Sequence, residues 1–165
     1  MPRSIWPALK GRLTDLTRSL RVGDVADFRN FMGAVIDGRS YARIQEYIGI
    51  ARNDAHCTVL AGGKGSDAEG FFVEPTLVET SEPKHRLMCE EIFGPVLTVW
   101  VYPDDEEAAA LALCDESTLY ALTGAIFAQD RSFIEFALRV LRFSAGNLYV
   151  NDKPTGAVVG QQPFG

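Results

Sequence analysis

The second half of the chain alternates short apolar runs with helical patterns, and this alternation constrains the fold more than any other feature. Residues 96–101 and 122–128 are rich in aliphatic, β-branched and aromatic side chains and too short for helices, so both are predicted as buried strands, and residues 147–150 as a third. Residues 104–113 begin with four acidic side chains that favour a helix start, and Asp130 is predicted to cap a second helix. Crossover connections of this kind predict an α/β fold of three layers, an open, largely parallel sheet with helices on both faces.

The first half of the chain is predicted to hold two helices and two short strands. Apolar residues at spacings of three and four indicate an amphipathic helix over residues 4–20, with Ser4 as its N-cap, and a second helix over residues 40–51. Residues 57–61 and 71–73 are predicted as strands on either side of a glycine-bearing surface loop.

Length and charge exclude several classes of protein. With 165 residues, the chain is long enough for one domain with a buried core. Its 22 acidic and 16 basic residues argue against nucleic acid or an anionic membrane as a partner, because a phosphate-binding face needs clustered Lys and Arg. The three cysteines cannot all pair within the chain, and no apolar stretch approaches a membrane span. The sequence therefore predicts a soluble, intracellular protein.

The cysteines and histidines do not form a convincing catalytic or metal-binding pattern. Cys57 lies in an apolar run, Cys114 lies at a helix end where the dipole disfavours a thiolate, and Cys89 is followed by two glutamates that disfavour it as well. His56 and His85 are predicted as surface residues without a partner, and no spacing matches a zinc site. A hydrolase that uses Cys89 is the least favoured interpretation.

The most distinctive string is Glu90-Glu91-Ile92-Phe93-Gly94-Pro95, directly before the predicted strand at residues 96–101. One interpretation is structural, with solvated glutamates at a helix end and Phe93 as a core plug. The other is functional, because a carboxylate can accept hydrogen bonds from ribose hydroxyls and an aromatic ring can pack against a nucleotide. Residues 151–165 form a turn-rich segment after the last strand, where ligand sites of open parallel sheets lie.

At these residues the chain resembles the aldehyde dehydrogenase superfamily, in which Glu-Glu-Ile-Phe-Gly-Pro is a signature of the catalytic domain. Segments in order along the whole chain are similar to its 1-pyrroline-5-carboxylate dehydrogenase branch: residues 70–76, 101–105, 122–130, 145–153 and 155–165. The resemblance implies NAD-dependent oxidation of a small-molecule aldehyde, L-glutamate γ-semialdehyde, to L-glutamate in proline degradation. In the family a cysteine thiolate adds to the aldehyde, hydride passes to NAD, and water releases the acid.

The resemblance also implies roles for individual residues. Glu91 would hold the ribose next to nicotinamide, Phe93 would pack beside it, and Leu122 would be a lesser neighbour of the cofactor. Gly156 and Ala157 would offer backbone N–H groups to the substrate carboxylate, and Phe164 would pack on the aliphatic chain of the substrate. Two departures are visible: Ala121 stands where many relatives have glycine, and Ala157 stands where some have serine, which removes a hydroxyl contact.

The resemblance further implies that residues 1–165 are a partial, truncated catalytic domain. The family nucleophile precedes a string like Pro2-Arg3-Ser4 by a few residues, and the cofactor-binding domain and the C-terminal association strand are absent. We therefore predict no catalytic residue here and no dehydrogenase activity for this chain alone. The complete enzyme is expected to be a homo-oligomer in the cytoplasm, or in the mitochondrial matrix of a eukaryote. The alternative is a non-catalytic binding or association module with the same fold.

Overall fold

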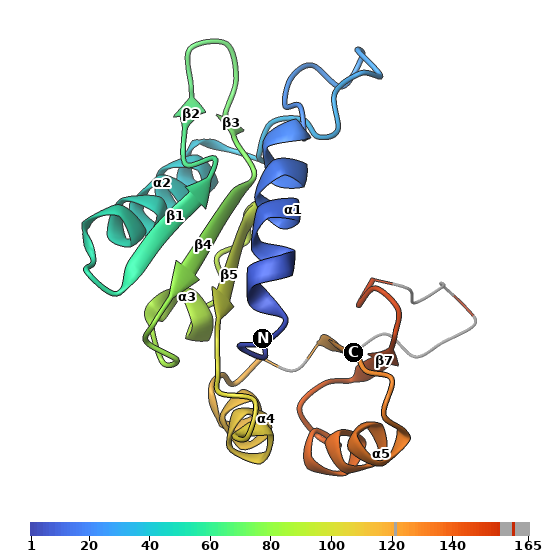
Figure 1. Ribbon diagram of the computed structural model, residues 1–165. Helices are drawn as coiled ribbons and strands as arrows, with labels where there is room; N and C mark the ends of the chain where they lie inside the picture. Colours follow the sequence, from blue (N-terminus) through green and yellow to red (C-terminus); the bar gives the residue numbers. More distant parts are fainter. Residues whose placement is uncertain (121, 156–159, 161–165) are drawn as a thin grey trace. The chain divides into compact units, whose positions relative to one another are not determined.

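A computed structural model of the chain describes residues 1–120, 122–155 and 160 (Figure 1). It divides into two compact units, Met1–Asp104 and Asp105–Gly165, each with its own apolar core. The first unit contains α1 (Trp6–Ser19), α2 (Gly38–Asn53), β1 (Cys57–Ala61), β2 (Gly65–Ser66), β3 (Phe72–Val73), β4 (Thr76–Thr80), α3 (Arg86–Cys89) and β5 (Val96–Trp100). The second contains α4 (Glu107–Glu116), β6 (Thr123–Ile126), α5 (Arg131–Val140) and β7 (Asn147–Val150).

The strands of the first unit form a mixed sheet with β4 at its centre, in the order β1-β4-β5. β4 pairs in parallel with β5 and antiparallel with β1, while β2 and β3 form a separate antiparallel pair. β4 runs antiparallel to β1 because only the β2–β3 excursion joins them, without a crossover helix. In the second unit, β6 and β7 are parallel, with α5 between them in the chain. The α/β class is confirmed, with sheets that are mixed as well as parallel.

Helices α1 and α2 cover opposite faces of the three-stranded sheet. Val78 of β4 packs in the core cluster with Ile44 and Ile48 of α2. The next residue, Glu79, accepts a hydrogen bond from Trp6 Nε1 of α1 at 3.0 Å and forms an ion pair with Lys10 Nζ at 2.5 Å. Because successive side chains of a strand point to opposite faces, this sheet has a helix on each side, as predicted.

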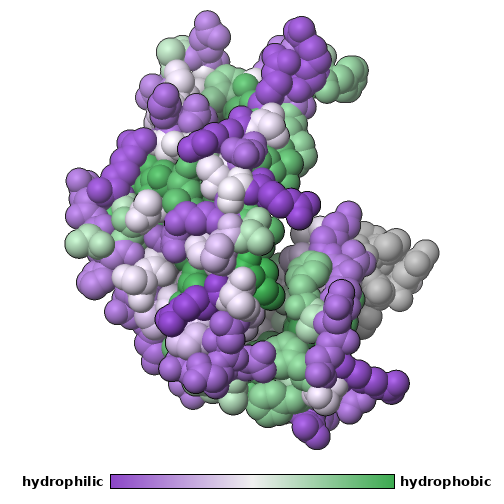
Figure 2. Space-filling model, viewed as in Figure 1, coloured by the Kyte–Doolittle hydropathy of each residue, from purple (hydrophilic) through white to green (hydrophobic). Residues whose placement is uncertain are grey.

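The apolar core of the first unit lies between α2 and the sheet. It joins residues of α2, of two strands and of the α3 region: Ile44, Tyr47, Ile48, Ala51, Val73, Val78, Leu87 and Ile92. Polar side chains cover most of the face seen in Figure 2, with apolar areas between them. Some large apolar side chains are exposed outside this core, among them Phe28, Phe31 and Ile36 in the segment between α1 and α2.

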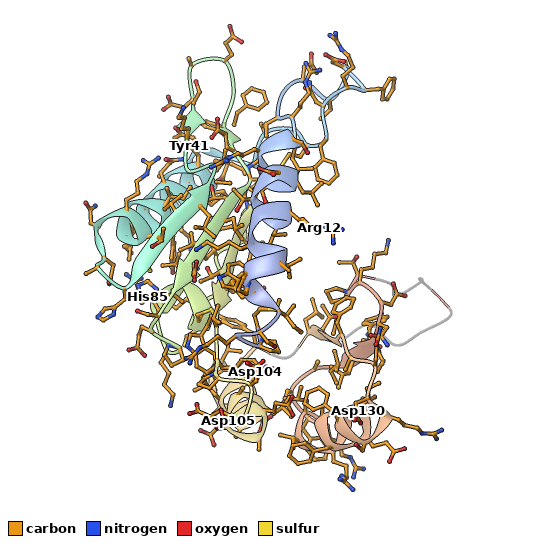
Figure 3. All side chains as sticks on the ribbon, viewed as in Figure 1. Arg12, Tyr41, His85, Asp104, Asp105 and Asp130 are labelled. Atoms are coloured by element: carbon orange, nitrogen blue, oxygen red, sulfur yellow. The ribbon has the colours of Figure 1, made fainter. Side chains whose placement is uncertain are left out.

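Three elements of the first unit were not predicted from the sequence: the two-residue strand β2, the central strand β4 and the short helix α3. The cap of α1 was also predicted wrongly. Ser4 uses its N–H and its hydroxyl to bind Asp104, at 3.1 and 2.5 Å, and Ile5 occupies the N-cap position without a side-chain bond (Figure 3). Helix α2 begins two residues earlier than predicted because the Asp37 carboxylate accepts the Ser40 N–H at 2.8 Å.

The second unit follows the sequence pattern closely. Strand β7 spans the predicted residues, and the Asp130 carboxylate caps α5 by accepting the Phe133 N–H at 3.0 Å (Figure 3). The apolar stripe of α5 packs on β6 through Ala137 and Leu141, which form a core with Ile126. No helix in the described part of the chain combines the length and apolarity needed to cross a membrane.

Candidate functional site

The candidate site is the segment from Glu90 to Pro95, which joins α3 to β5. Glu90 ends α3, and its N–H donates to the Arg86 carbonyl at 2.9 Å. At the other end, the Pro95 carbonyl accepts the Thr76 N–H of β4 at 2.7 Å, so the segment is fixed to the central strand before β5 begins. We call residues 90–95 the signature loop.

The two adjacent glutamates of the signature loop have different surroundings. The Glu90 carboxylate accepts hydrogen bonds from Arg86 at 2.9 and 3.0 Å and from the Tyr47 hydroxyl. The Glu91 side chain is exposed, and its carboxylate makes no hydrogen bond or ion pair with any other described residue. Glu90 is therefore a structural anchor, and Glu91 is the carboxylate that remains available to a ligand.

Acid titration should separate Glu90 from ordinary glutamates. Hydrogen bonds lower the pKa of Glu90 from 4.5 to about 2, with the larger effect from Arg86 and a smaller one from Tyr47. The folded-state pKa lies below the unfolded one, so this contribution to stability is complete above about pH 4.5 and is lost as the pH falls toward about 2. In a carbon-detected NMR titration, Arg86→Gln should move the midpoint of the Glu90 carboxyl upward, toward 4.5, while Arg39→Gln leaves it in place. A wild-type midpoint near 4.5 would contradict this assignment.

Phe93 points away from the core, against the structural interpretation that it plugs the core. Its side chain is 78% exposed, and the adjacent Ile92 is the buried residue, at 8%. The backbone of Phe93 has φ +58°, in the left-handed region that non-glycine residues rarely adopt. A residue held there persists only where its surroundings fix it, and such positions cluster at ligand sites.

The remaining predicted site residues belong to the second unit. Leu122 directly precedes β6, is 50% exposed, and accepts the Asn147 N–H through its carbonyl at 3.3 Å. Of the three predicted cofactor residues, Glu91 and Phe93 thus lie together on the signature loop, and Leu122 lies in the other unit. Gly156, Ala157 and Phe164, as well as the departure at Ala121, lie outside the described residues.

Two of the three thiols, those of Cys57 and Cys114, lack the features of an activated nucleophile. None of the three forms a disulfide. Cys57 and Cys89 are partly buried, and Cys114 is exposed overall although its sulfur atom is partly desolvated. Burial raises the pKa of the Cys57 thiol and, likewise, that of the Cys114 thiol. Both shifts disfavour the thiolate that nucleophilic catalysis needs.

Sequence reasoning missed a cluster around His85, which was predicted at the surface and is buried. Its Nδ1 accepts the Leu87 N–H at 3.1 Å and so caps α3. The proton of the neutral ring therefore lies on Nε2, which faces Asp54 Oδ2 at 3.4 Å and Cys57 Sγ at 3.6 Å. In this tautomer His85 cannot take a proton from Cys57, so the cluster is no catalytic dyad. His56 is exposed, as predicted.

Comparison with known proteins identifies the family. A model of the aldehyde dehydrogenase family matches residues 1–165. The chain belongs to the aldehyde dehydrogenase family.

Relatives within the aldehyde dehydrogenase family are similar over the whole chain. The human delta-1-pyrroline-5-carboxylate dehydrogenase, mitochondrial, is 52% identical across 100% of this chain and 30% of its own length. The delta-pyrroline-5-carboxylate dehydrogenase of Mycobacterium tuberculosis bound with NAD is 45% identical, with a TM-score of 0.90 over 99% of this chain and 29% of its own. The 1-pyrroline-5-carboxylate dehydrogenase from Thermus with bound NAD is 36% identical, with a TM-score of 0.85. The chain spans about 30% of the length of the curated relatives it matches.

Among the residues that the structure describes, no group of three His, Cys, Asp or Glu side chains could hold a metal ion. In this member of the aldehyde dehydrogenase family, the candidate site is the signature loop, with its free Glu91 carboxylate and exposed Phe93 ring. Within that loop, sequence reasoning singled out Glu91 and Phe93 but missed the side chains of α2 that contact it. Those side chains lie more than 40 positions away in the sequence, so no local motif marks them.

Proposed function

We propose that this chain is part of an NAD-dependent 1-pyrroline-5-carboxylate dehydrogenase that oxidises L-glutamate γ-semialdehyde to L-glutamate. The names of the most similar curated relatives and solved structures support this substrate, and two of those structures were determined with NAD. The observation that carries the cofactor assignment is the pairing of an unpartnered Glu91 carboxylate with an outward Phe93 ring on one fixed loop.

The residues of the signature loop fit a nicotinamide nucleotide. Glu91 has free acceptor oxygens for ribose hydroxyls, and Phe93 offers an exposed aromatic face beside them. When bound, NAD supplies the hydride acceptor of the oxidation. In this proposal Leu122 is a further apolar neighbour of the cofactor. Gly156 and Ala157 donate backbone N–H groups to the substrate carboxylate, and Phe164 packs on the aliphatic part of the substrate.

The proposal extends to the organisation of the complete enzyme. Residues 1–165 would form part of its catalytic domain, with the cofactor-binding domain and the association strand contributed by other parts of the protein. This agrees with the 30% share of the relatives' length that the chain covers. We propose a homo-oligomer, located in the cytoplasm or the mitochondrial matrix; the names of several relatives include the word mitochondrial.

A kinetic experiment on the complete dehydrogenase that contains this segment tests the proposal. When 1-pyrroline-5-carboxylate and NAD are supplied, we expect the enzyme to form NADH, which is measured by its absorbance. Glu91→Ala should raise the KM for NAD about 10- to 100-fold, because hydrogen bonds to a charged group contribute roughly 1.5–3 kcal/mol. Glu46→Ala, at an exposed carboxylate of α2, is the matched control and should leave KM unchanged.

Two results would contradict the proposal. One is a complete protein that folds but binds no nicotinamide nucleotide, which would favour the non-catalytic module instead. The other is a KM for NAD that is insensitive to Glu91→Ala. The 165-residue chain alone is the negative control for turnover, because burial raises the pKa of the Cys57 and Cys114 thiols and two glutamates follow Cys89.

A further inference from the structure

Four side chains connect helix α2 and helix α3 to the signature loop, and we call them the Tyr47 cluster: Arg43, Tyr47, Arg86 and Glu90. Tyr47 is 3% exposed, and two guanidinium groups lie over its ring, that of Arg43 at 5.7 Å and that of Arg86 at 5.2 Å from the ring centre. Its hydroxyl donates to the Glu90 carboxylate, which Arg86 also binds. The cluster thus joins two cations, one ring and one anion in a single connected group.

The Tyr47 cluster holds the signature loop at two successive residues. Glu90 is held through its side chain, and Glu91 is held through its backbone, because Arg43 Nη2 donates to the Glu91 carbonyl at 2.6 Å. Arg43 is one helical turn before Tyr47, so both side chains project from the same face of α2. Neither contact involves the Glu91 carboxylate, which is therefore left free while its backbone is fixed.

The far side of the loop is fixed as well. Ile92 is buried in the core, and a Cβ on Gly94 would lie 2.6 Å from Ile44 of α2, so the backbone passes very close to that helix. Between these anchors, Phe93 keeps a positive φ and an exposed ring. A strained conformation of an exposed residue requires neighbours that fix it, and α2 supplies three of them, Arg43, Ile44 and Tyr47.

We propose that Arg43 and Tyr47 are positioning residues, which fix the signature loop so that Glu91 and Phe93 face the nicotinamide riboside part of NAD. This inference rests on the proposed function, but it assigns roles to residues that the signature does not contain. Arg43 and Tyr47 contact neither substrate nor cofactor in this scheme. They act by removing the freedom of the loop before the nucleotide binds, which lowers the entropic cost of binding.

The test uses the 165-residue chain and two NMR measurements. The first is backbone ¹⁵N relaxation without ligand, in which Glu91 and Phe93 should have order parameters of about 0.85, the value of rigid backbone. The second is titration with nicotinamide mononucleotide, the half of NAD that this loop would contact, with AMP as the control ligand. The unsubstituted chain should show amide shifts at residues 91–94 with the first ligand only.

The variants separate positioning from general stabilisation. Tyr47→Phe keeps the buried ring and removes the hydroxyl, and Arg43→Gln removes the guanidinium from an exposed position. Each should lower the order parameters of residues 91–93 and weaken nicotinamide mononucleotide binding about threefold or more, through lost preorganisation. Arg43→Lys, which can still donate to the Glu91 carbonyl, should recover part of both. Arg39→Gln, on the same helix and 96% exposed, should change neither.

Unchanged order parameters in both Tyr47→Phe and Arg43→Gln would overturn the inference. So would Arg43→Lys behaving no better than Arg43→Gln. If Tyr47→Phe does not fold, the surface variants of Arg43 decide the matter alone. Absence of any shift in the unsubstituted chain would instead contradict the proposed cofactor site, and the relaxation data would still show whether Arg43 and Tyr47 fix the loop.

Discussion

Gly62→Ala is expected to destabilise the first unit by about 3 kcal/mol, because it combines backbone strain with a clash that cannot relax cheaply. Gly62 follows β1 and has φ +69°, a conformation that side chains rarely adopt. An added Cβ would lie 2.1 Å from the carbonyl oxygen of Pro75 and 2.9 Å from its carbon, and both atoms are backbone. Relief would require a shift of the chain directly before the central strand β4.

Chemical denaturation, followed by circular dichroism, measures this effect. The matched control is Gly49→Ala, the same substitution in the middle of α2, where nothing lies within 4 Å of the added Cβ. That variant should be more stable by roughly 0.5–1 kcal/mol, because alanine has the higher helix propensity. Equal effects of the two substitutions would contradict the steric argument, since the chemical change is identical and only the surroundings differ.

Gly94→Ala is the second large effect, with an expected loss of about 1–3 kcal/mol through overpacking. An added Cβ would lie 2.6 Å from both Cδ1 and Cγ1 of Ile44, a residue with no exposed surface at all. Because Ile44 is enclosed by the core, its side chain cannot swing away. The substitution should therefore also displace the neighbouring Phe93 and disturb the amide signals of the signature loop.

A double-mutant cycle identifies the clash. Ile44→Ala alone should cost about 2–5 kcal/mol, as expected for truncation of a fully buried side chain. In that background Gly94→Ala should cost close to nothing, since the new methyl group enters the space that Ile44 vacated. A favourable coupling of roughly 0.5 kcal/mol or more supports direct contact. Strictly additive effects would mean that Gly94 is required for another reason.

The sequence predicted the second unit well because its signals are local. The acidic cap at Asp130 and the apolar stripe of α5 are visible within a few residues, and so is strand β7. The central strand β4 was missed because its sequence contains Glu79, which reads as a surface residue. That carboxylate is accommodated by Trp6 and Lys10 of α1, and such a partnership between distant segments is invisible to local patterns.

The candidate site shows the same division between local and distant causes. The signature string alone directs attention to Glu91 and Phe93. It cannot show which of the two adjacent glutamates is hydrogen-bonded within the protein, because the answer depends on Tyr47, which lies 43 positions away from Glu90. It also leaves open whether Phe93 fills the core or faces outward; in the structure that ring is exposed, at a positive φ, and the neighbouring Ile92 is buried.

Asn151 has a consequence for how sequences of this kind can vary. It follows β7 with φ +55°, its N–H donates to the Ile126 carbonyl at 2.8 Å, and its side chain exchanges two hydrogen bonds with the backbone of Ala128, at 3.0 and 2.9 Å. An amide side chain thereby completes the parallel ladder that the strand itself has left. Replacement by aspartate would keep an acceptor for the Ala128 N–H but lose the donor to the Ala128 carbonyl, so this position tolerates little change if β6 and β7 are to stay paired to their ends.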